Sequence, residues 1–237
     1  MIKKAVILAG GLSERMNGYA DSVIKCLLPI GNETILGRTI KMLKKNGVED
    51  IVLIIGYKAE EVKKEFGDSV RYVEEPFYTK EGMLDSLHYA AHEFNEPCLF
   101  SYADSVFNED VLKKIIESEK KDVVCLLSKK KVDEEAEKIR FIDSKIIECS
   151  KEIPIDKADS QFTGMIKLSE KGSEIVRETL NSLKESDEIE YKNVRDLITI
   201  MANNGNSIPF EEVEADDWME IDFLHEYEFA KKQFVTQ

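Results

Sequence analysis

Positive charge, cysteine and proline are all scarce in this chain. Its 237 residues include four cysteines and five prolines, and 33 lysines and arginines face 47 aspartates and glutamates, which gives a net charge of −14 at pH 7. A surface this acidic repels phosphate backbones, so general nucleic-acid binding is disfavoured. A nucleotide can still bind, because a few placed cations and a metal ion dominate the field inside a cleft.

Long apolar runs are also missing. No segment approaches the roughly 18 apolar residues of a membrane-spanning helix, and the opening MIKKAVILAGG lacks the length and cleavage pattern of a signal peptide. The cysteines are widely spaced, which favours buried thiols in a reducing compartment over disulfides or a metal cluster. They are Cys26, Cys98, Cys125 and Cys149. These absences predict a cytoplasmic protein that contacts no membrane.

Strand-like and helix-like segments alternate in the first half. Apolar runs typical of strands covered on both faces lie at 5–8, 51–55, 70–73, 98–102 and 123–127. The segments between them predict one helix from the N-cap Asn32 to Gly47, two over 59–66 and 81–94, and one that begins at Asn108. This βαβ series predicts an α/β fold with a mixed, mostly parallel, Rossmann-like sheet and helices on both faces.

The second half changes character. Two apolar segments, 139–142 and 146–149, flank Asp143-Ser144 and predict a hairpin. Further strands are predicted at 161–168 and 207–213, and further helices from Ser169, over 193–204 and after Asp222. No repeat or linker interrupts the chain. We therefore expect a single domain over 1–237, with a nucleotide-binding half (1–128) and an acceptor-binding, closing half (129–237).

The stretch LAGGLSERMN, at 8–17, follows the first apolar strand. Its glycine pair places unobstructed backbone N–H groups at the carboxyl edge of the sheet, where open α/β sheets bind ligands. Arg15 adds a fork of donors suited to phosphate oxygens, and Lys25, in IKCLLPIG, adds a mobile point charge. Neither the P-loop pattern nor G-x-G-x-x-G occurs here. The glycines alone fit a plain strand-to-helix turn equally well.

The opening segment resembles the nucleotidyltransferase superfamily. LAGGLSERM, a lysine before LLPIG, and IVLIIGY match its pattern L-[AG]-G-x-[GS]-x-R-[ML], followed by K-x-[LP]-[LP]. Serine in this loop, with methionine after the arginine, is similar to the molybdopterin nucleotidyltransferase branch. GYKAEEVKKEF, VRYVEEPFYTKEGMLDSL, SYADSVF, QFTGMIKLSEKG and WMEIDFLHEY look more like the phosphocholine cytidylyltransferase branch and its relatives acting on phosphonates. Two features depart from the pattern: Ser13 replaces the glycine of many sugar-nucleotide enzymes, and the usual proline before Lys25 is missing.

The resemblance implies a fold of the nucleotide-diphospho-sugar transferase type and a set of site residues. It implies catalytic roles for Arg15, Lys25, Asp104, Lys151 and Asp222. It implies nucleotide contacts for Leu8, Ala9, Gly10, Gly11, Ser13, Glu14, Arg15, Gly82 and Ser86. Asp104 and Asp222 are expected to bind Mg²⁺, since two carboxylates with phosphate oxygens and waters make a normal magnesium site. From the residues alone, a helix N-cap or loop role explains each aspartate better, and a surface role explains Lys151 equally well.

Nucleotidyl transfer needs no protein nucleophile, because the acceptor's phosphate or phosphonate oxygen is already an anion near neutral pH. It attacks the α-phosphorus of an NTP in line and pyrophosphate leaves, so the protein must position two polyanions and neutralise their charge. The expected substrates are an NTP, by resemblance CTP, and a small phosphorylated acceptor such as phosphocholine or an aminoalkylphosphonate. Whether the protein forms a homodimer stays open.

Four aromatic residues are candidates for a cage around a cationic acceptor, although scattered aromatics are more often core residues. They are Tyr78, Tyr102, Tyr191 and Trp218. Asp85 is a further candidate for contact with a ribose or an acceptor amine. His88 and His92 stand four apart on one predicted helix, but no third ligand accompanies them, so a helix-face role is favoured over zinc binding.

Three other interpretations stay open. The first is a nucleotidyltransferase for a sugar 1-phosphate or for molybdopterin, although chain length and the EID ending argue against molybdopterin. The second is an inactive nucleotide-binding regulatory module, which Lys25 or Asp222 pointing away from the cleft would favour. The third is a Rossmann-type oxidoreductase, against which the missing glycine fingerprint counts heavily.

Overall fold

Strands and helices alternate in the computed structural model, which describes residues 2–11, 24–76, 82–129 and 132–234. The main elements of the first half are β1 (Lys4–Leu8), α1 (Ile35–Lys45), β4 (Asp50–Ile55), α2 (Ala59–Phe66), β5 (Arg71–Glu74), α3 (Met83–Tyr89), β6 (Cys98–Tyr102), α4 (Glu109–Glu117) and β8 (Val123–Ser128). The second half contributes β9 (Lys138–Ile142), β10 (Lys145–Ser150), β11 (Ser160–Leu168), α5 (Glu170–Glu185), α6 (Val194–Asn203), β12 (Phe210–Val213), β13 (Trp218–Glu220) and α7 (Leu224–Gln233). Three short strands complete the order: β2 (Pro29–Ile30), β3 (Glu33–Thr34) and β7 (Ser105–Phe107).

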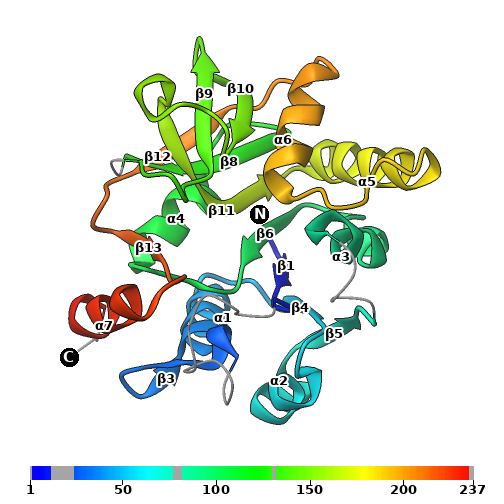
Figure 1. The fold of residues 1–237 in the computed structure, drawn as a ribbon. Helices are drawn as coiled ribbons and strands as arrows, with labels where there is room; N and C mark the ends of the chain where they lie inside the picture. Colours follow the sequence, from blue (N-terminus) through cyan, green and yellow to red (C-terminus); the bar gives the residue numbers. More distant parts are fainter. Residues whose placement is uncertain (1, 12–23, 77–81, 130–131, 235–237) are drawn as a thin grey trace.

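A mixed sheet occupies the centre of the molecule, with strands in the order β10-β9-β11-β6-β1-β4-β5 (Figure 1). β1 pairs in parallel with β4 and with β6, and β4 pairs in parallel with β5. The long strand β11 runs antiparallel to β6, β8 and β9, and so joins both halves of the chain into one sheet. The predicted mixed sheet with a parallel first half is confirmed.

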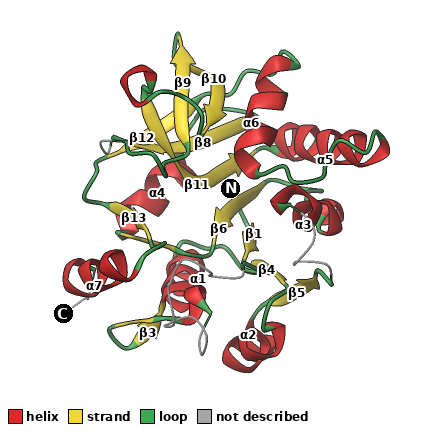
Figure 2. Cartoon of the chain, in the orientation of Figure 1, coloured by secondary structure: helices red, strands yellow, loops and turns green. Residues whose placement is uncertain are grey.

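Helices cover both faces of this sheet, as predicted. Alternate residues of β1 enter different cores: Val6 packs on one face, and Ala5 and Ile7 pack on the other. The Val6 core takes its helical residues from α3, α5 and α6, which Figure 2 shows grouped on one side. The other core takes them from α1, α2 and α4. Within the described residues, no helix is both long enough and apolar enough to cross a bilayer.

The boundaries of two predicted helices are wrong. The N-cap of α1 is Thr34 rather than Asn32, because the Thr34 hydroxyl accepts a hydrogen bond from the Gly37 N–H at 3.0 Å. The helix expected over 81–94 ends at Tyr89, and a separate 3₁₀ turn follows at Ala91–Glu93. The predicted hairpin is present, and its turn residues Asp143 and Ser144 both have positive φ, as a tight two-residue hairpin turn requires.

All four cysteines are buried and unbridged, as predicted. Cys98, Cys125 and Cys149 lie on β6, β8 and β10. Burial raises the pKa of the Cys26 and Cys98 thiols to about 12, so these side chains stay protonated and behave as small apolar groups.

Gly164 lies at a bulge in β11, where the register against β8 shifts between Phe162 and Ile166. Its φ is +81°, and a Cβ at this position would lie 2.4 Å from Cδ2 of Tyr102. The bulge therefore makes room for the Tyr102 ring at the carboxyl end of β6.

We expect Gly164→Ala to lower the free energy of unfolding by about 3 kcal/mol, because overlap with the Tyr102 ring adds to the strain of a positive φ. Gly205→Ala is the matched control, since its φ is +84° but nothing lies within 4 Å of an added Cβ. Backbone strain alone costs about 1 kcal/mol there. Urea unfolding of both variants measures the difference, and equal losses would show that the Tyr102 ring moves aside at no cost.

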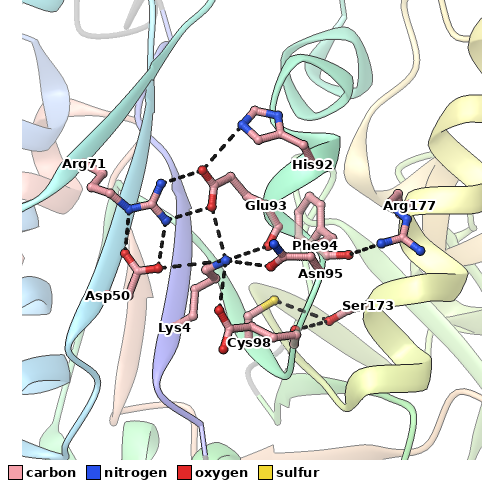
Figure 3. A network of polar contacts seen from close by, with 11 residues as sticks. Lys4, Asp50, Arg71, His92, Glu93, Phe94, Asn95, Cys98, Ser173 and Arg177 are labelled. Carbon is pink, nitrogen blue, oxygen red and sulfur yellow. Dashed lines mark hydrogen bonds and ion pairs between the residues drawn. The ribbon is translucent and has the colours of Figure 1, made fainter.

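Lys4 is buried at the amino end of β1, with 3% of its surface exposed. Its ammonium lies 3.2 Å from Glu93 Oε2 (Figure 3). A second carboxylate oxygen, Glu96 Oε1, lies 3.1 Å from the same ammonium. Arg71 makes paired hydrogen bonds to Glu93 and to Asp50. The Arg71 hydrogen bonds, together with those from Lys4, lower the pKa of Glu93 to about 2. This network ties the amino ends of β1, β4 and β5 to the 3₁₀ turn after α3.

We expect Glu93→Gln to lower the free energy of unfolding by about 2 kcal/mol at pH 7, because the buried Lys4 then loses its buried carboxylate partner and keeps the half-exposed Glu96. The pKa of Glu93 falls from 4.5 to about 2 on folding, so its stabilising effect is present above pH 4.5 and is lost as the pH falls toward 2. The difference between variant and wild type should shrink over that range in urea titrations. The control Glu49→Gln removes an exposed pair with Lys3 and should cost less than about 1 kcal/mol. A Glu93→Gln effect that is independent of pH would contradict this account.

Candidate active site

A two-stranded ribbon brings acidic segments from the two halves of the chain together. β7 follows Asp104 and β13 precedes Asp222, and the two strands pair antiparallel with Ser105 opposite Glu220. Beside this pair, the Ile221 N–H donates to the Asp104 carbonyl at 3.0 Å. The register therefore puts Asp104 and Asp222 in neighbouring positions, just beyond the carboxyl end of β6.

Lys25 bridges these two aspartates. It begins a 3₁₀ turn, Lys25–Leu27, and its two chain neighbours, Ile24 and Cys26, are buried. Its Nζ lies 2.6 Å from Asp104 Oδ2 and 2.8 Å from Asp222 Oδ1. Burial alone would lower the pKa of Lys25, but the nearby carboxylates outweigh burial and raise this pKa above its ordinary value. The ammonium is therefore charged at neutral pH.

Glu220 is a third carboxylate in this site, and the sequence alone does not single it out. One oxygen from each of Asp104, Glu220 and Asp222 lies within 4.8 Å of the other two. The described ranges contain no other group of three acidic or metal-ligating side chains this close together. We call these three residues the carboxylate group. Burial and the charges of Asp104 and Asp222 raise the pKa of Glu220 well above its usual range. Glu220 stands two residues before Asp222, and side chains two apart in an extended segment point the same way. That spacing could have suggested Glu220 once Asp222 was a candidate.

The carboxylate group fits a hard divalent cation. Mg²⁺ prefers oxygen ligands from carboxylates, phosphates and water. Oδ1 of Asp104 is buried and has no hydrogen-bond partner among the described residues, an arrangement that is costly unless a cation or water completes it. The N-cap of α7 is Phe223, and the N–H groups of Asp222 and Phe223 donate to Glu226. Asp222 is therefore not needed as a helix cap.

The two glycines of the opening loop have different surroundings. Leu8 ends β1, and Ala9, Gly10 and Gly11 follow it. A Cβ at Gly10 would lie 3.2 Å from the backbone nitrogen of Gly56, whereas a Cβ at Gly11 would meet nothing within 4 Å. Close packing therefore explains Gly10, and the backbone at Gly11 is open to an approaching ligand. The predicted site residues Ser13, Glu14 and Arg15 lie outside the described residues.

Gly82 and Ser86, predicted to approach the nucleotide, both have packing roles. Gly82 is the N-cap of α3, and a Cβ there would lie 2.6 Å from the Lys192 carbonyl oxygen. The Ser86 hydroxyl donates to Glu75 Oε2 at 2.6 Å in a buried position. These contacts account for both residues, and their contact with a nucleotide stays a prediction.

Lys151 follows β10, and its Nζ lies 3.1 Å from Glu135 Oε2. Burial raises the pKa of the neighbouring Glu137, and the charges of Arg195 and Lys151 act in the opposite direction. Lys151 thus lies within electrostatic reach of Glu137, whose own charge acts on the pKa of Glu220. The role of Lys151 toward an acceptor phosphate stays a prediction.

The candidate aromatic residues that the structure describes do not form a cage, and two of them are core residues, which is the interpretation that the sequence favoured. Trp218 is buried in the core that contains α1, and Tyr102 in the core on the opposite face of the sheet. Tyr191 is 77% exposed, and Tyr78 lies outside the described residues. The three described side chains do not surround a common space.

Asp85 and the two histidines also lie outside the carboxylate group. Asp85 is buried, and its Oδ1 lies 3.0 Å from Lys184 Nζ, which ties α3 to α5. His88 belongs to α3, whereas His92 lies in the 3₁₀ turn after that helix ends. The pair therefore does not share one helix face.

A family model described as the MobA-like NTP transferase domain matches residues 5–158. The bifunctional IPC transferase and DIPP synthase of Aquifex aeolicus is 29% identical to 99% of this chain, which spans about half (52%) of that protein. The CTP:phosphoglutamine cytidylyltransferase of Campylobacter jejuni is 25% identical over 94% of this chain and 97% of its own length.

Solved structures show the same fold over the whole chain. The inositol-1-phosphate CTP transferase from T. maritima superposes with a TM-score of 0.79 at 22% identity, covering 100% of this chain and 98% of that one. The CTP:phosphocholine cytidylyltransferase from Streptococcus pneumoniae gives 0.73 at 19% identity, covering 98% and 99%. The family match covers more than half of the chain and includes the glycine loop, Lys25 and Asp104. The chain is a nucleotidyltransferase that belongs to the MobA-like NTP transferase family.

Proposed function

We propose that the protein is a Mg²⁺-dependent cytidylyltransferase, which transfers CMP from CTP onto a small phosphorylated or phosphonate acceptor and releases pyrophosphate. The observation that supports this most is the Lys25 ammonium between the carboxylates of Asp104 and Asp222, with Glu220 beside them. A cation and clustered carboxylates at the edge of an α/β sheet match the needs of nucleotidyl transfer, in which charge around the α-phosphate must be controlled.

Asp104, Asp222 and Glu220 are the residues that would hold Mg²⁺, which when bound neutralises phosphate charge and orients the phosphates. Lys25 and Arg15 have the role of stabilising the α-phosphate and the departing pyrophosphate, as the family resemblance implies. The open backbone at Gly11 contacts the nucleotide. Each of these groups positions a substrate or neutralises charge, and none of them acts as a nucleophile.

CTP is proposed as the donor because the Campylobacter relative, which aligns with 94% of this chain, is named for it. Lys151 is proposed to meet the acceptor phosphate, since it lies near Glu137 on the side of the second half. A sugar 1-phosphate remains the alternative acceptor. An inactive nucleotide-binding module is disfavoured, because Lys25 pairs with Asp222 inside the site and Asp222 belongs to the carboxylate group.

Pyrophosphate release tests this proposal. The protein is incubated with Mg²⁺, each of the four NTPs and each of five acceptors: phosphocholine, phosphoethanolamine, aminoethylphosphonate, glucose 1-phosphate and myo-inositol 1-phosphate. Release with CTP and an acceptor supports the proposal. Release with UTP or GTP and an acceptor, but not with CTP, keeps the nucleotidyltransferase and changes the nucleotide that it uses. Absence of release in every combination, with NTP binding still measurable, would favour the inactive module.

A further inference from the structure

A second polar cluster lies beside the carboxylate group and has no part in the chemistry proposed above. The Tyr102 hydroxyl donates to Glu137 Oε2 at 3.2 Å, and Arg195 Nη1 donates to Glu137 Oε1 at 3.1 Å. Tyr102 ends β6, Glu137 precedes β9, and Arg195 lies in the first turn of α6. We call these three residues the Glu137 cluster. It draws on both halves of the chain, so it forms only where they meet.

The Glu137 cluster lies at the same edge of the sheet as the carboxylate group. Tyr102 is two residues before Asp104 and pairs with the last residue of β1, from which the glycine loop leaves. Glu137 is close enough for its charge to act on the pKa of Glu220, although burial and the charges within the site act on it more strongly. Lys151 acts in turn on the pKa of Glu137. An acceptor whose phosphate meets Lys151 and the Mg²⁺ that the carboxylate group would hold is therefore within reach of the cluster.

The bulge at Gly164 in β11 accommodates one member of this cluster, Tyr102. The Gly164 bulge exists where an ordinary β-strand residue would overlap the Tyr102 ring, and bulges of this kind are typical of positions next to active sites. The side chains of Glu137 and Arg195 are 11% and 22% exposed. The cluster is thus a nearly buried carboxylate with a partly exposed guanidinium.

The chemistry of the cluster suits hydroxyl groups. Arg195 and Glu137 have opposite charges and Tyr102 is neutral, so the cluster has no net charge. A guanidinium carries five N–H donors and each carboxylate oxygen has two lone pairs, so the internal bonds do not exhaust its hydrogen-bonding capacity. Hydroxyl groups both donate and accept, whereas a quaternary ammonium offers no donor and binds best over aromatic faces.

We propose that the Glu137 cluster determines acceptor specificity by binding hydroxyl groups, and that the acceptor is a phosphorylated polyol. This inference rests on the proposed function and narrows it. The chemistry is unchanged: an oxygen of the polyol phosphate bonds to the α-phosphorus of the nucleotide as the bond to pyrophosphate breaks.

The test compares Glu137→Gln and Arg195→Gln with the wild type, using myo-inositol 1-phosphate and the hydroxyl-free acceptor phosphocholine. Both variants should raise KM for myo-inositol 1-phosphate at least 10-fold, while KM for CTP stays within 2-fold. Tyr102→Phe keeps the ring that fills the bulge and should raise the same KM less. Arg140→Gln is the matched control, because Arg140 is an exposed residue of β9 paired with Glu148.

Unchanged KM values for myo-inositol 1-phosphate in folded variants would overturn the proposal, and thermal unfolding checks the fold of each variant. A wild type that uses phosphocholine but no polyol phosphate would also overturn it. Release with neither acceptor counts against it too. Phosphoethanolamine and aminoethylphosphonate then show whether the proposed function fails with it, because release with either of them keeps the cytidylyltransferase and discards the polyol acceptor.

Discussion

Asp104→Asn is expected to lower turnover at least 10²-fold, about the loss seen when one main electrostatic stabiliser of a transition state is removed. Asp104 contributes a carboxylate to the group that contains Glu220 and Asp222, and it holds Lys25 at 2.6 Å. The amide has nearly the same size but no charge, so the fold should persist while the affinity for a divalent cation falls. The measurement is the rate of pyrophosphate release at saturating CTP and acceptor, as a function of Mg²⁺ concentration.

Asp217→Asn is the control for this variant. Asp217 stands at the other end of the same ribbon, where it accepts a hydrogen bond from the Asn108 side chain at an exposed position. The Asp217→Asn substitution removes one negative charge, as Asp104→Asn does, but away from the carboxylate group. Turnover should therefore stay within 2-fold of the wild type. An Asp104→Asn enzyme of near-normal rate, or an equal loss in Asp217→Asn, would remove Asp104 from the reaction.

The sequence predicts the sheet well because its information there is local. Apolar runs such as 51–55 and 98–102 are continuous because parallel strands are covered on both faces, and they coincide with β4 and β6. Asp104 could be placed at the carboxyl edge for the same reason, since it directly follows such a run. The hairpin at Asp143-Ser144 is equally local, because a tight turn needs residues that tolerate positive φ.

The missed features depend on pairings between distant segments. Glu220 joins the site only because β13 pairs with β7. The local sequence WMEID does not indicate that its partner strand is the one that follows Asp104. Gly82 looks like a ligand-contacting glycine until the backbone of Lys192 is found against it. The candidate aromatic cage could not be decided from the sequence for a related reason. Sequence spacing does not reveal that Trp218 and Tyr102 enter cores on opposite faces of the sheet.

Lys25→Met should change two measurements in opposite directions. Turnover is expected to fall at least 10²-fold, because the charge that we propose meets the α-phosphate is lost. Binding of Mn²⁺ to the protein without nucleotide should tighten about 10-fold, because removing a cation so close to two carboxylates removes strong repulsion for an incoming ion. Lys25 Nζ lies 2.6 Å from an oxygen of Asp104 and 2.8 Å from an oxygen of Asp222. These are two of the side chains that would ligate the ion.

Mn²⁺ affinity is measured by calorimetry in the absence of nucleotide, so the result does not depend on turnover. Lys41→Met is the control, since Lys41 pairs with Glu33 at an exposed position on α1 and α1 supplies no residue to the carboxylate group. Weaker Mn²⁺ binding in Lys25→Met would show that Lys25 organises the carboxylates for the ion instead of competing with it. Tighter binding together with lost turnover would show that one set of carboxylates serves two cations in turn. In that case the carboxylates would hold either Lys25 or the ion, and the Lys25 charge would be available to the α-phosphate whenever the ion is bound.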